Sequence, residues 1–317
     1  MPILHPPARL RDEKLGRSRM TLKHVIESQQ FTVPLLMELF DRSRLMERIV
    51  ARGGTLDYQN RILASLFYQP STRTRFSFEA AMHRLGGRVL STEHARAFSS
   101  EIEAEQVEDS IRIIGSYCDV IVIRHHEPGG AARAAKVSPV PIINAGDGGQ
   151  HPTQALLELY TIYRERPLDG LSVAFIGELD RGRTARSLTY LLAKFERVKL
   201  YFVSPPEMQM RSDILQYLDR HGVRFELESD IDRVLGEVDV IYQTRILPER
   251  LPRLGTHRYA INSSVLQRMK PDAMIMHPLP RTVELDKSVD DDPRALYFRQ
   301  AANGLYVRMA LLTMMLE

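Results

Sequence analysis

The chain has 317 residues, of which 44% are hydrophobic and 26% charged, and this is enough apolar sequence for two domains with separate cores. Its formal net charge of +3 favours neither nucleic acid nor a membrane surface as a partner, and no apolar run approaches the roughly 20 residues of a membrane span. The single cysteine, Cys118, excludes an internal disulfide, and the opening MPILHPPARLRDEK lacks the apolar stretch of a secretory signal, so we expect a cytoplasmic protein.

Seven short apolar runs are predicted strands. Their continuous apolar character is typical of strands that are covered on both faces. Amphipathic stretches lie between them, including predicted helices near 78–85 and 107–114. This alternation of strand and helix predicts a parallel α/β architecture. The predicted strands cover residues 62–68, 120–124, 140–145, 171–177, 198–203, 238–243 and 273–277.

The strands form two series along the chain. A predicted helix at about 152–164 separates the series and the loop ERPLDG follows it, while a final helix at about 299–316 can pack back on the first series. The predicted fold class is therefore α/β, with two doubly wound parallel-sheet domains joined by a bridging helix. The predicted domains are residues 1–150 plus 299–317, and residues 151–298.

The loops after the predicted strands carry most of the chemistry-bearing residues. In open parallel sheets, ligands bind beyond the carboxyl ends of the strands. Arg, His, Thr and Gln gather in these loops, which predicts one binding site built from several of them. In chain order the loops read QPSTRTR, HHEPGG, GDGGQHPTQ, ELDRGRTARS, TRILPER and PLPR.

The first loop combines hydroxyl groups with arginine. Pro70 and Ser71 are good helix-start residues, so the next helix points its free N–H groups and its positive dipole end at the loop. The hydroxyls of Ser71, Thr72 and Thr74 add donors, and Arg73 adds a two-pronged donor for an oxyanion. These features favour a phosphate site, although the loop has no Walker A pattern. The alternative is a helix cap followed by two solvated arginines.

The loop GDGGQHPTQ supplies glycines for a tight turn and then a second helix start. His151 and Gln154 are three residues apart, which puts both side chains on one helix face. His151 could donate to a carbonyl or move a proton, and the alternative is that it only caps or packs the helix. His125, His126 and His277 match no metal-ligand spacing, so we expect no metal.

Seven segments together form a recognisable pattern. The segments are FYQPSTRTRFSFEAAMHRLGG, RHHEPGGAAR, NAGDGGQHPTQALLELYTI, GRTARSL, YQTR, MHPLPR and DPRALYFRQAANGLYVRMALL. Their order and spacing resemble those of the aspartate carbamoyltransferase catalytic chain, in the aspartate/ornithine carbamoyltransferase superfamily, across nearly the whole sequence. STRTR with HPTQ is highly specific for the superfamily, and YQTR favours the aspartate branch.

The resemblance implies a fold and a reaction. It implies a carbamoyl-phosphate domain and an amino-acid domain, assembled as a homotrimer with active sites between subunits. It also implies transfer of a carbamoyl group from carbamoyl phosphate to an amine acceptor, with no cofactor, and with the charge on the carbamoyl oxygen stabilised by fixed donors.

The resemblance also implies roles for individual residues. The implied phosphate cradle is Ser71, Thr72, Arg73 and Thr74. The other implied roles are Arg124 and His151 as donors to the carbamoyl oxygen, Gln154 with the backbone carbonyls of Pro278 and Leu279 as acceptors for the carbamoyl NH2, and Arg183 and Arg245 as clamps for the acceptor's carboxylates.

One departure from the family pattern concerns closure. Gln69 stands where the family has a glutamate before STRTR. The resemblance makes that glutamate the partner of Arg183 and Arg250 across the domain gap. An amide cannot offer these arginines a charge, so we expect weaker closure.

Two further departures concern the acceptor. In the segment that corresponds to the family's shared loop, Ser99 matches the serine that is lent to a neighbouring active site, whereas Glu103 replaces a lysine. A glutamate there would repel anionic substrates. Leu247 replaces a glutamine that helps to hold aspartate.

These departures leave the carbamoyl-phosphate residues intact. We therefore favour a carbamoyltransferase with another amine as acceptor, in which Glu103 could hold a cationic group and Leu247 could line an apolar part. One alternative is an ordinary aspartate carbamoyltransferase of pyrimidine biosynthesis. The other is a non-catalytic paralogue that binds carbamoyl phosphate or a partner.

Overall fold

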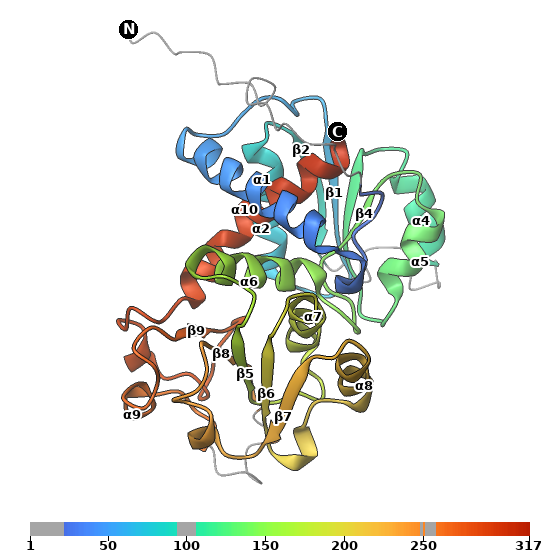
Figure 1. Cartoon of the computed structure of the whole chain (residues 1–317). Helices are drawn as coiled ribbons and strands as arrows, with labels where there is room; N and C mark the ends of the chain where they lie inside the picture. The colour runs from blue at the N-terminus through green and yellow to red at the C-terminus, as the bar shows by residue number, and fades with distance from the viewer. Residues whose placement is uncertain (1–21, 94–105, 248–249, 251–257) are drawn as a thin grey trace, which may run out of the picture. The chain divides into compact units, whose positions relative to one another are not determined.

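The computed structural model describes residues 22–93, 106–247, 250 and 258–317 (Figure 1). The chain divides into two compact units. Unit 1 comprises Met1–Thr153 and Gly304–Glu317, and unit 2 comprises Gln154–Asn303. Both changes of unit fall inside helices, near the start of α6 (Pro152–Glu165) and within α10 (Tyr297–Leu316).

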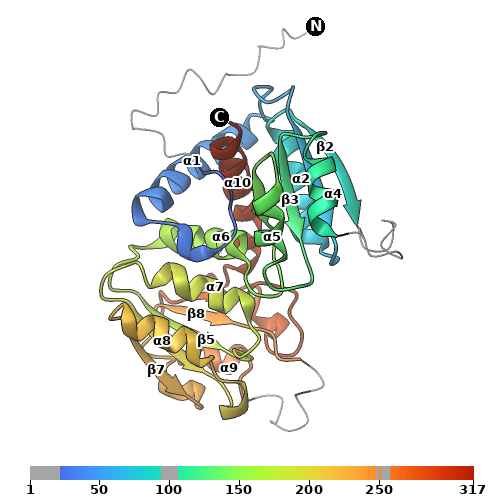
Figure 2. The ribbon, with the colours of Figure 1, turned by 90° about the vertical axis from the view of Figure 1, so that its right-hand side faces the viewer.

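Unit 1 contains a parallel four-stranded sheet in the order β2-β1-β3-β4. Helices α1, α2 and the last part of α10 cover one face, and α4 and α5 cover the other (Figures 1 and 2). The strands are β1 (Ile62–Phe67), β2 (Arg88–Glu93), β3 (Val120–Arg124) and β4 (Ile142–Asn144), and the helices are α1 (Val33–Ala51), α2 (Thr72–Arg84), α4 (Val107–Ile114) and α5 (Gly130–Val137).

The two faces of this sheet are packed by alternate residues of each strand. Ala64 and Leu66 of β1 lie in a buried cluster with Ile111 of α4 and Ala131 of α5. Ser65, between them, faces α2, where its hydroxyl donates to Glu79 at 3.0 Å. Both faces of the sheet are thus buried, which is why its inner strands read as continuous apolar runs.

Unit 2 contains a parallel five-stranded sheet in the order β7-β6-β5-β8-β9. Ala174 and Ile176 of β5 belong to a large buried cluster on one face, whereas Phe175 packs against Phe202 and Tyr242 on the other. The strands are β5 (Ser172–Ile176), β6 (Lys199–Val203), β7 (Arg224–Glu228), β8 (Val240–Gln243) and β9 (Met274–Met276), and the helices outside α6 and α10 are α7 (Arg183–Leu192), α8 (Ser212–Arg220) and α9 (Ser263–Leu266).

The predicted α/β class with two parallel sheets is confirmed, but two strands were missed. Both missed strands, β2 and β7, are at sheet edges. No residue of β7 is buried, and its sequence RFELE contains no apolar run. An edge strand needs little apolar character because one side of it has no neighbouring strand to pack against.

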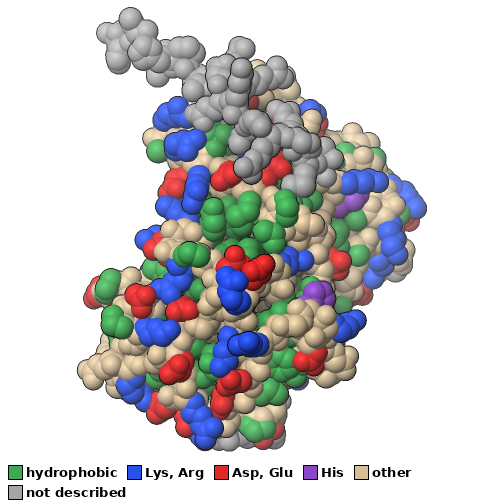
Figure 3. Space-filling model, in the orientation of Figure 1, with side chains coloured by type: hydrophobic (Ala, Val, Ile, Leu, Met, Phe, Trp, Pro, Cys, Tyr) green, Lys and Arg blue, Asp and Glu red, His purple; other side chains and the backbone are tan. Residues whose placement is uncertain are grey.

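Three further properties concern the whole set of described residues. On the face shown in Figure 3, acidic and basic side chains are interspersed, in keeping with the small net charge. No helix in the described part of the chain is long and apolar enough to cross a membrane. Cys118 is half-buried, and burial raises the pKa of its thiol to about 11, so it stays protonated at neutral pH.

Candidate functional site

The α2 N-terminus lies at the carboxyl edge of the unit 1 sheet. Strands β1 and β3 end in register, with Phe67 opposite Arg124, and the N–H of Tyr68 donates to the Arg124 carbonyl at 2.9 Å. Ser71 precedes the helix in an extended conformation, and its side chain makes no capping hydrogen bond. The N–H groups of the first helical turn have no partners within the helix and are available to an anion, which weakens the alternative of a simple side-chain cap.

The side chains of this first turn differ in their surroundings. Arg73 is exposed at the helix start. Partial desolvation lowers its pKa, but the usual pKa of a guanidinium is so high that Arg73 stays charged at neutral pH. Thr74 is buried. Arg75 lies 3.8 Å from the carboxylate of Glu79, one turn further along the helix. Arg73 is therefore the arginine of this loop placed to meet a ligand at the helix N-terminus.

Arg124 and His151 meet at the same edge of the sheet. Both side chains are buried, and Nη1 of Arg124 lies 3.5 Å from Nε2 of His151. The same Nη1 donates to the carbonyl of Ala145 at 3.2 Å. A guanidinium can only donate hydrogen bonds. The pair can offer hydrogen-bond donors to an oxygen that gains negative charge.

The loop that carries His151 depends on one glycine and one aspartate. Gly146 has φ of +106°, and a Cβ there would lie 2.8 Å from Cδ2 of His151 and 2.9 Å from Nη1 of Arg124. Buried Asp147 accepts hydrogen bonds from the N–H groups of Gly129, Gly149 and Gln150. The carboxylate of Asp147 therefore fixes the turn that brings His151 to Arg124.

His125 and His126 stack on each other, with ring centroids 4.5 Å apart. His125 is buried, and burial and the neighbouring His126 lower its pKa, so its ring is neutral. Its Nδ1 accepts from the N–H of Glu127 at 3.1 Å. Among the described residues, no cluster of three His, Cys, Asp or Glu side chains could hold a metal ion.

In unit 2, Gln154 begins a buried polar cluster. Its Nε2 donates to Oε1 of Glu158 at 2.9 Å, which leaves its own Oε1 as an acceptor. The hydroxyl of Tyr242 donates to the same Glu158 oxygen at 2.7 Å, and Nε2 of Gln300 does so at 3.2 Å. Sequence reasoning missed this cluster, although a glutamate inside the apolar helix stretch ALLELY is a signal that could have found it.

The loop after β9 has a conformation that is unusual for leucine. Leu279 has φ of +52°, in the left-handed region. Its N–H donates to Nδ1 of His277 at 2.8 Å, and Nε2 of His277 lies 3.0 Å from Oε1 of Glu284. The N–H of Thr282 donates to that oxygen too, at 2.8 Å. His277 and Glu284 are both buried, so this pair fixes the backbone from Leu279 to Thr282.

A pH dependence of stability follows from Glu284. Burial alone would raise its pKa, but hydrogen bonds from His277 and Thr282 outweigh burial and hold the pKa below its usual 4.5. Its ionised form therefore stabilises the fold above that pH, and the contribution is lost as pH falls through the folded-state pKa. We expect Glu284→Gln to lower the melting temperature by a constant amount above about pH 5.5, and by less below about pH 4.5.

Scanning calorimetry of both proteins between about pH 7 and pH 3.5 checks this expectation. Glu237→Gln, at an exposed carboxylate of the same unit, is the matched control and should give no pH-dependent difference. A difference between Glu284→Gln and the original chain that does not change with pH would contradict the assignment.

The residues expected to clamp an acceptor follow neighbouring strands of unit 2. Strand β5 pairs with β8, with Ile176 opposite Gln243. Arg183 is the first residue of α7, which follows β5, and Arg245 is exposed two residues after β8. The carboxyl ends of these strands meet at one edge, so both arginines belong to that edge of the sheet.

The segment after β8 is tied to unit 2 by carboxylates. The N–H of Leu247 donates to Glu178 at 3.1 Å, and its side chain is half-buried. Arg250 pairs with Glu178 at 2.6 Å and with Asp180 at 3.0 Å, and the hydrogen bonds to Asp180 and Glu178 raise its pKa. Arg250, which the resemblance made a partner of position 69, thus has partners inside unit 2.

Three other residues of the departures can be placed only in part. Gln69 is half-buried in unit 1, and Ser99 and Glu103 lie outside the described residues.

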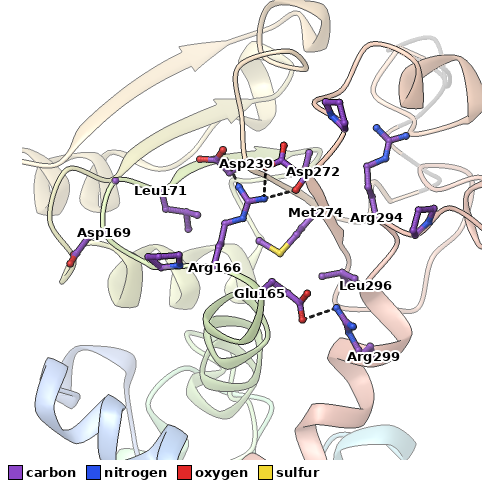
Figure 4. Close-up of a pocket in the computed structure, with 15 residues that line it drawn as sticks. Glu165, Arg166, Asp169, Leu171, Asp239, Asp272, Met274, Arg294, Leu296 and Arg299 are labelled. Carbon is purple, nitrogen blue, oxygen red and sulfur yellow. Dashed lines mark hydrogen bonds and ion pairs between the residues drawn. The ribbon is translucent and has the colours of Figure 1, made fainter.

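A cavity of about 740 Å³ lies at the opposite, amino edge of the unit 2 sheet (Figure 4). Five of its charged side chains pair within the lining: Arg166 with Asp239 at 3.1 Å and with Asp272 at 3.3 Å, and Arg299 with Glu165 at 2.8 Å. None of the residues predicted for the site lines it. The cavity is therefore separate from the candidate site.

Comparisons with known proteins cover almost the whole chain. The family model of the aspartate/ornithine carbamoyltransferase carbamoyl-P binding domain matches residues 23–164, and that of the Asp/Orn binding domain matches residues 169–315. A chloroplastic aspartate carbamoyltransferase 1 of Pisum sativum is 52% identical over 307 residues, covering 94% of this chain and 80% of the relative.

Solved structures are similar over the same extent. The catalytic subunit of Methanocaldococcus jannaschii aspartate transcarbamoylase has a TM-score of 0.85 and 43% identity, covering 92% of this chain and 97% of the other. Aspartate transcarbamoylase of Trypanosoma cruzi, in complex with carbamoyl phosphate and aspartate, has a TM-score of 0.88 and 37% identity, covering 93% and 96%.

The expectation of a cytoplasmic protein is wrong. The relative from Pisum sativum and one from Oryza sativa, which is 50% identical, are both named as chloroplastic enzymes. The expectation rested on the absence of an apolar secretory stretch. Plastid transit peptides are rich in Ser and Arg rather than apolar, so that criterion cannot detect them.

The two family models leave few residues uncovered, and they correspond to the two parallel-sheet units. The relatives named above are 37–52% identical over more than nine-tenths of the chain. This chain belongs to the aspartate/ornithine carbamoyltransferase family.

Proposed function

We propose that the chain transfers the carbamoyl group of carbamoyl phosphate to aspartate. The observation that carries the proposal is the meeting of Arg124 and His151 beside the start of α2, at the carboxyl edge of the unit 1 sheet. The names of the relatives favour aspartate as acceptor over the rebuilt acceptor site that we expected from Gln69, Glu103 and Leu247. The proposed enzyme is thus an ordinary aspartate carbamoyltransferase, acting in pyrimidine biosynthesis.

Unit 1 is the proposed carbamoyl-phosphate domain. The first-turn N–H groups of α2, the hydroxyls of Ser71, Thr72 and Thr74, and the guanidinium of Arg73 would hold the phosphate. Arg124 would donate to the carbamoyl oxygen, with His151 beside it. Preorganised donors at this oxygen stabilise the charge that develops on it during attack.

Unit 2 is the proposed acceptor domain. Arg183 and Arg245 would bind the two carboxylates of aspartate, as the resemblance implies. Oε1 of Gln154 and the carbonyls of Pro278 and Leu279 would accept hydrogen bonds from the carbamoyl NH2. The aspartate amine attacks the carbamoyl carbon, the bond from that carbon to the phosphate oxygen breaks, and the proton that the amine loses leaves on the phosphate.

The proposed working assembly is a homotrimer, in which Ser99 and Glu103 of one subunit serve the active site of its neighbour. The resemblance supports this arrangement. A solution molar mass of three chains is expected. Mixing chains with Ser99→Ala and chains with Arg124→Gln should restore activity that neither has alone, because some sites would then receive an unchanged residue from each chain. A monomer of full activity would contradict the trimer.

Phosphate release from carbamoyl phosphate, measured against a panel of amines, tests the proposed reaction. The panel is aspartate, ornithine, 2,3-diaminopropionate and simple amines. Turnover with aspartate above the other amines is the expected result. Turnover with another amine and little with aspartate would instead support an acceptor site rebuilt for that amine. Binding of carbamoyl phosphate without turnover would favour a non-catalytic role.

Substituting Gly146 should damage the carbamoyl-oxygen donors. In Gly146→Ala, the new Cβ would press on His151 and on Arg124, and we expect kcat to fall by about tenfold or more. Gly129→Ala is the matched control, because Gly129 also has a positive φ, of +78°, but a Cβ there meets nothing within 4 Å. Steady-state kinetics and melting temperatures of both variants separate the two effects. Equal losses of activity would mean that backbone strain, and not the contact, is responsible.

A further inference from the structure

A buried carboxylate in the middle of α6 accepts three hydrogen bonds. Glu158 is fully buried, and its Oε1 accepts from Nε2 of Gln154, the hydroxyl of Tyr242 and Nε2 of Gln300. These donors come from α6, β8 and α10, all within unit 2. All three hydrogen bonds end on one oxygen of a fully buried side chain, so Glu158 and its three donors hold one another in place.

The same network continues to the loop after β9. Oε1 of Gln300 accepts from the N–H of His277 at 3.1 Å, and Nδ1 of His277 accepts from the N–H of Leu279 at 2.8 Å. On the other side of the His277 ring, Nε2 lies 3.0 Å from Oε1 of Glu284. An unbroken chain of hydrogen bonds thus runs from the Gln154 amide to the Leu279 peptide, whose φ of +52° needs such support.

The Glu158 carboxylate sets the orientation of both glutamine amides in this hydrogen-bond network. Gln154 and Gln300 both turn their NH2 groups toward Oε1 of Glu158, which accepts a hydrogen bond from each of them. Oε1 of Gln154 is then directed away from Glu158, and Oε1 of Gln300 is directed to the N–H of His277. Because the two glutamine amides could otherwise be placed either way round, Glu158 determines which of their groups act as acceptors.

Tyr242 supports this arrangement. Burial raises the pKa of its phenol well above the usual value, so it remains a donor to Glu158 at any working pH. Thr184 hydrogen-bonds to the same phenol, and Thr184 follows Arg183 at the start of α7. The network therefore also reaches the helix turn that carries one of the proposed aspartate clamps.

We propose that Glu158 is a positioning residue for recognition of the carbamoyl NH2, which it controls by fixing the orientation of Gln154 and, through Gln300 and His277, the peptide at Leu279. The inference rests on the proposed function. It makes Glu158 the origin of selectivity between carbamoyl phosphate and an acyl phosphate that carries a methyl group in place of the NH2. A site built to hydrogen-bond a group discriminates strongly against an analogue that lacks it.

Glu158→Gln tests this role, because glutamine keeps the size of the side chain but can present either a donor or an acceptor to Gln154. The probes are carbamoyl phosphate, acetyl phosphate and inorganic phosphate. We expect kcat/KM for carbamoyl phosphate to fall by about 10- to 100-fold, with kcat/KM for acetyl phosphate and the inhibition constant of inorganic phosphate changed by about twofold or less. A purely structural role would weaken all three together.

Thr161→Val is the matched control. Thr161 is buried one turn further along α6, where its hydroxyl accepts from Nδ2 of Asn303 at 2.9 Å, and this bond does not lead to Gln154. This variant should lose thermal stability. Its ratio of kcat/KM for carbamoyl phosphate to kcat/KM for acetyl phosphate should stay the same. Glu158→Asp keeps an acceptor-only group but withdraws it by one methylene, and it should lower the ratio by about threefold to tenfold.

The outcomes separate the inference from the proposed function. If the original chain neither binds carbamoyl phosphate nor carbamoylates aspartate, both fail. If the original chain is active and Glu158→Gln retains the same ratio, the inference alone is overturned. If Glu158→Gln does not fold, Glu158→Asp decides, and an unchanged ratio in that variant overturns the inference as well.

Discussion

Replacing Arg124 with glutamine is expected to lower kcat by about 10²- to 10³-fold, while carbamoyl phosphate still binds. Arg124 is buried at the carboxyl end of β3, held by the Ala145 carbonyl and beside His151. A donor fixed in this way needs no reorganisation when negative charge develops on the carbamoyl oxygen. Loss of one such donor typically costs about 10²–10³ in kcat. The substitution leaves the proposed phosphate contacts at the α2 start untouched, so KM should change far less.

Steady-state kinetics with saturating aspartate, and direct titration with carbamoyl phosphate, measure the two effects separately. The matched control is Arg112→Gln, since Arg112 is an exposed arginine of unit 1 that pairs with Asp109 at 2.8 Å. We expect near-normal kinetics in this control, because exposed ion pairs contribute little. A kcat for Arg124→Gln within about threefold of the original would remove Arg124 from the proposed chemistry.

Replacing Arg73 with alanine is expected to weaken phosphate binding by about 10- to 100-fold, the usual contribution of a charge-assisted hydrogen bond that is lost. Arg73 is the exposed arginine in the first turn of α2, where the helix N–H groups and dipole already favour an anion. Carbamoyl phosphate and inorganic phosphate should both be affected, because the contact is to the group that they share. Calorimetric titration with each ligand measures the effect.

Arg84→Ala, in the last turn of the same helix, provides the comparison. Arg84 is also exposed, and it donates to the Gly53 carbonyl at 3.1 Å. It lies at the negative end of the helix dipole, so its removal should leave phosphate affinity unchanged. Equal weakening in both variants would indicate a non-specific effect of charge and would argue against a phosphate site at the α2 start.

The parts of the candidate site that could be predicted from the sequence are those with local causes. PSTRTR follows a buried strand and begins a helix, and short-range chemistry suffices to predict an anion site there. Arg124 could be identified as a polar residue at the carboxyl end of a strand, and His151 as one in the loop that follows the next strand. Their separation of 3.5 Å depends on the turn held by Asp147 and on the positive φ of Gly146.

The Glu158 network could not be predicted in the same way. Glu158 and Gln300 are 142 residues apart in the chain, and Glu158 and Tyr242 are 84 apart. A polar residue inside an apolar segment signals a buried partner, but the sequence does not say which one. Arg250 shows the same limit, since its carboxylate partners are 70 and 72 residues away.

The sequence by itself determined the α/β class, the two series of strands, the family and the loops that carry the candidate site. These follow from apolar runs, helical spacing and motifs, all of which are local. Tertiary structure alone decided the edge strands β2 and β7, the pairing of Arg124 with His151, and the orientation of the Gln154 amide by Glu158. The physical reason is that burial and hydrogen-bond direction depend on which distant segments meet, and a local pattern does not contain that information.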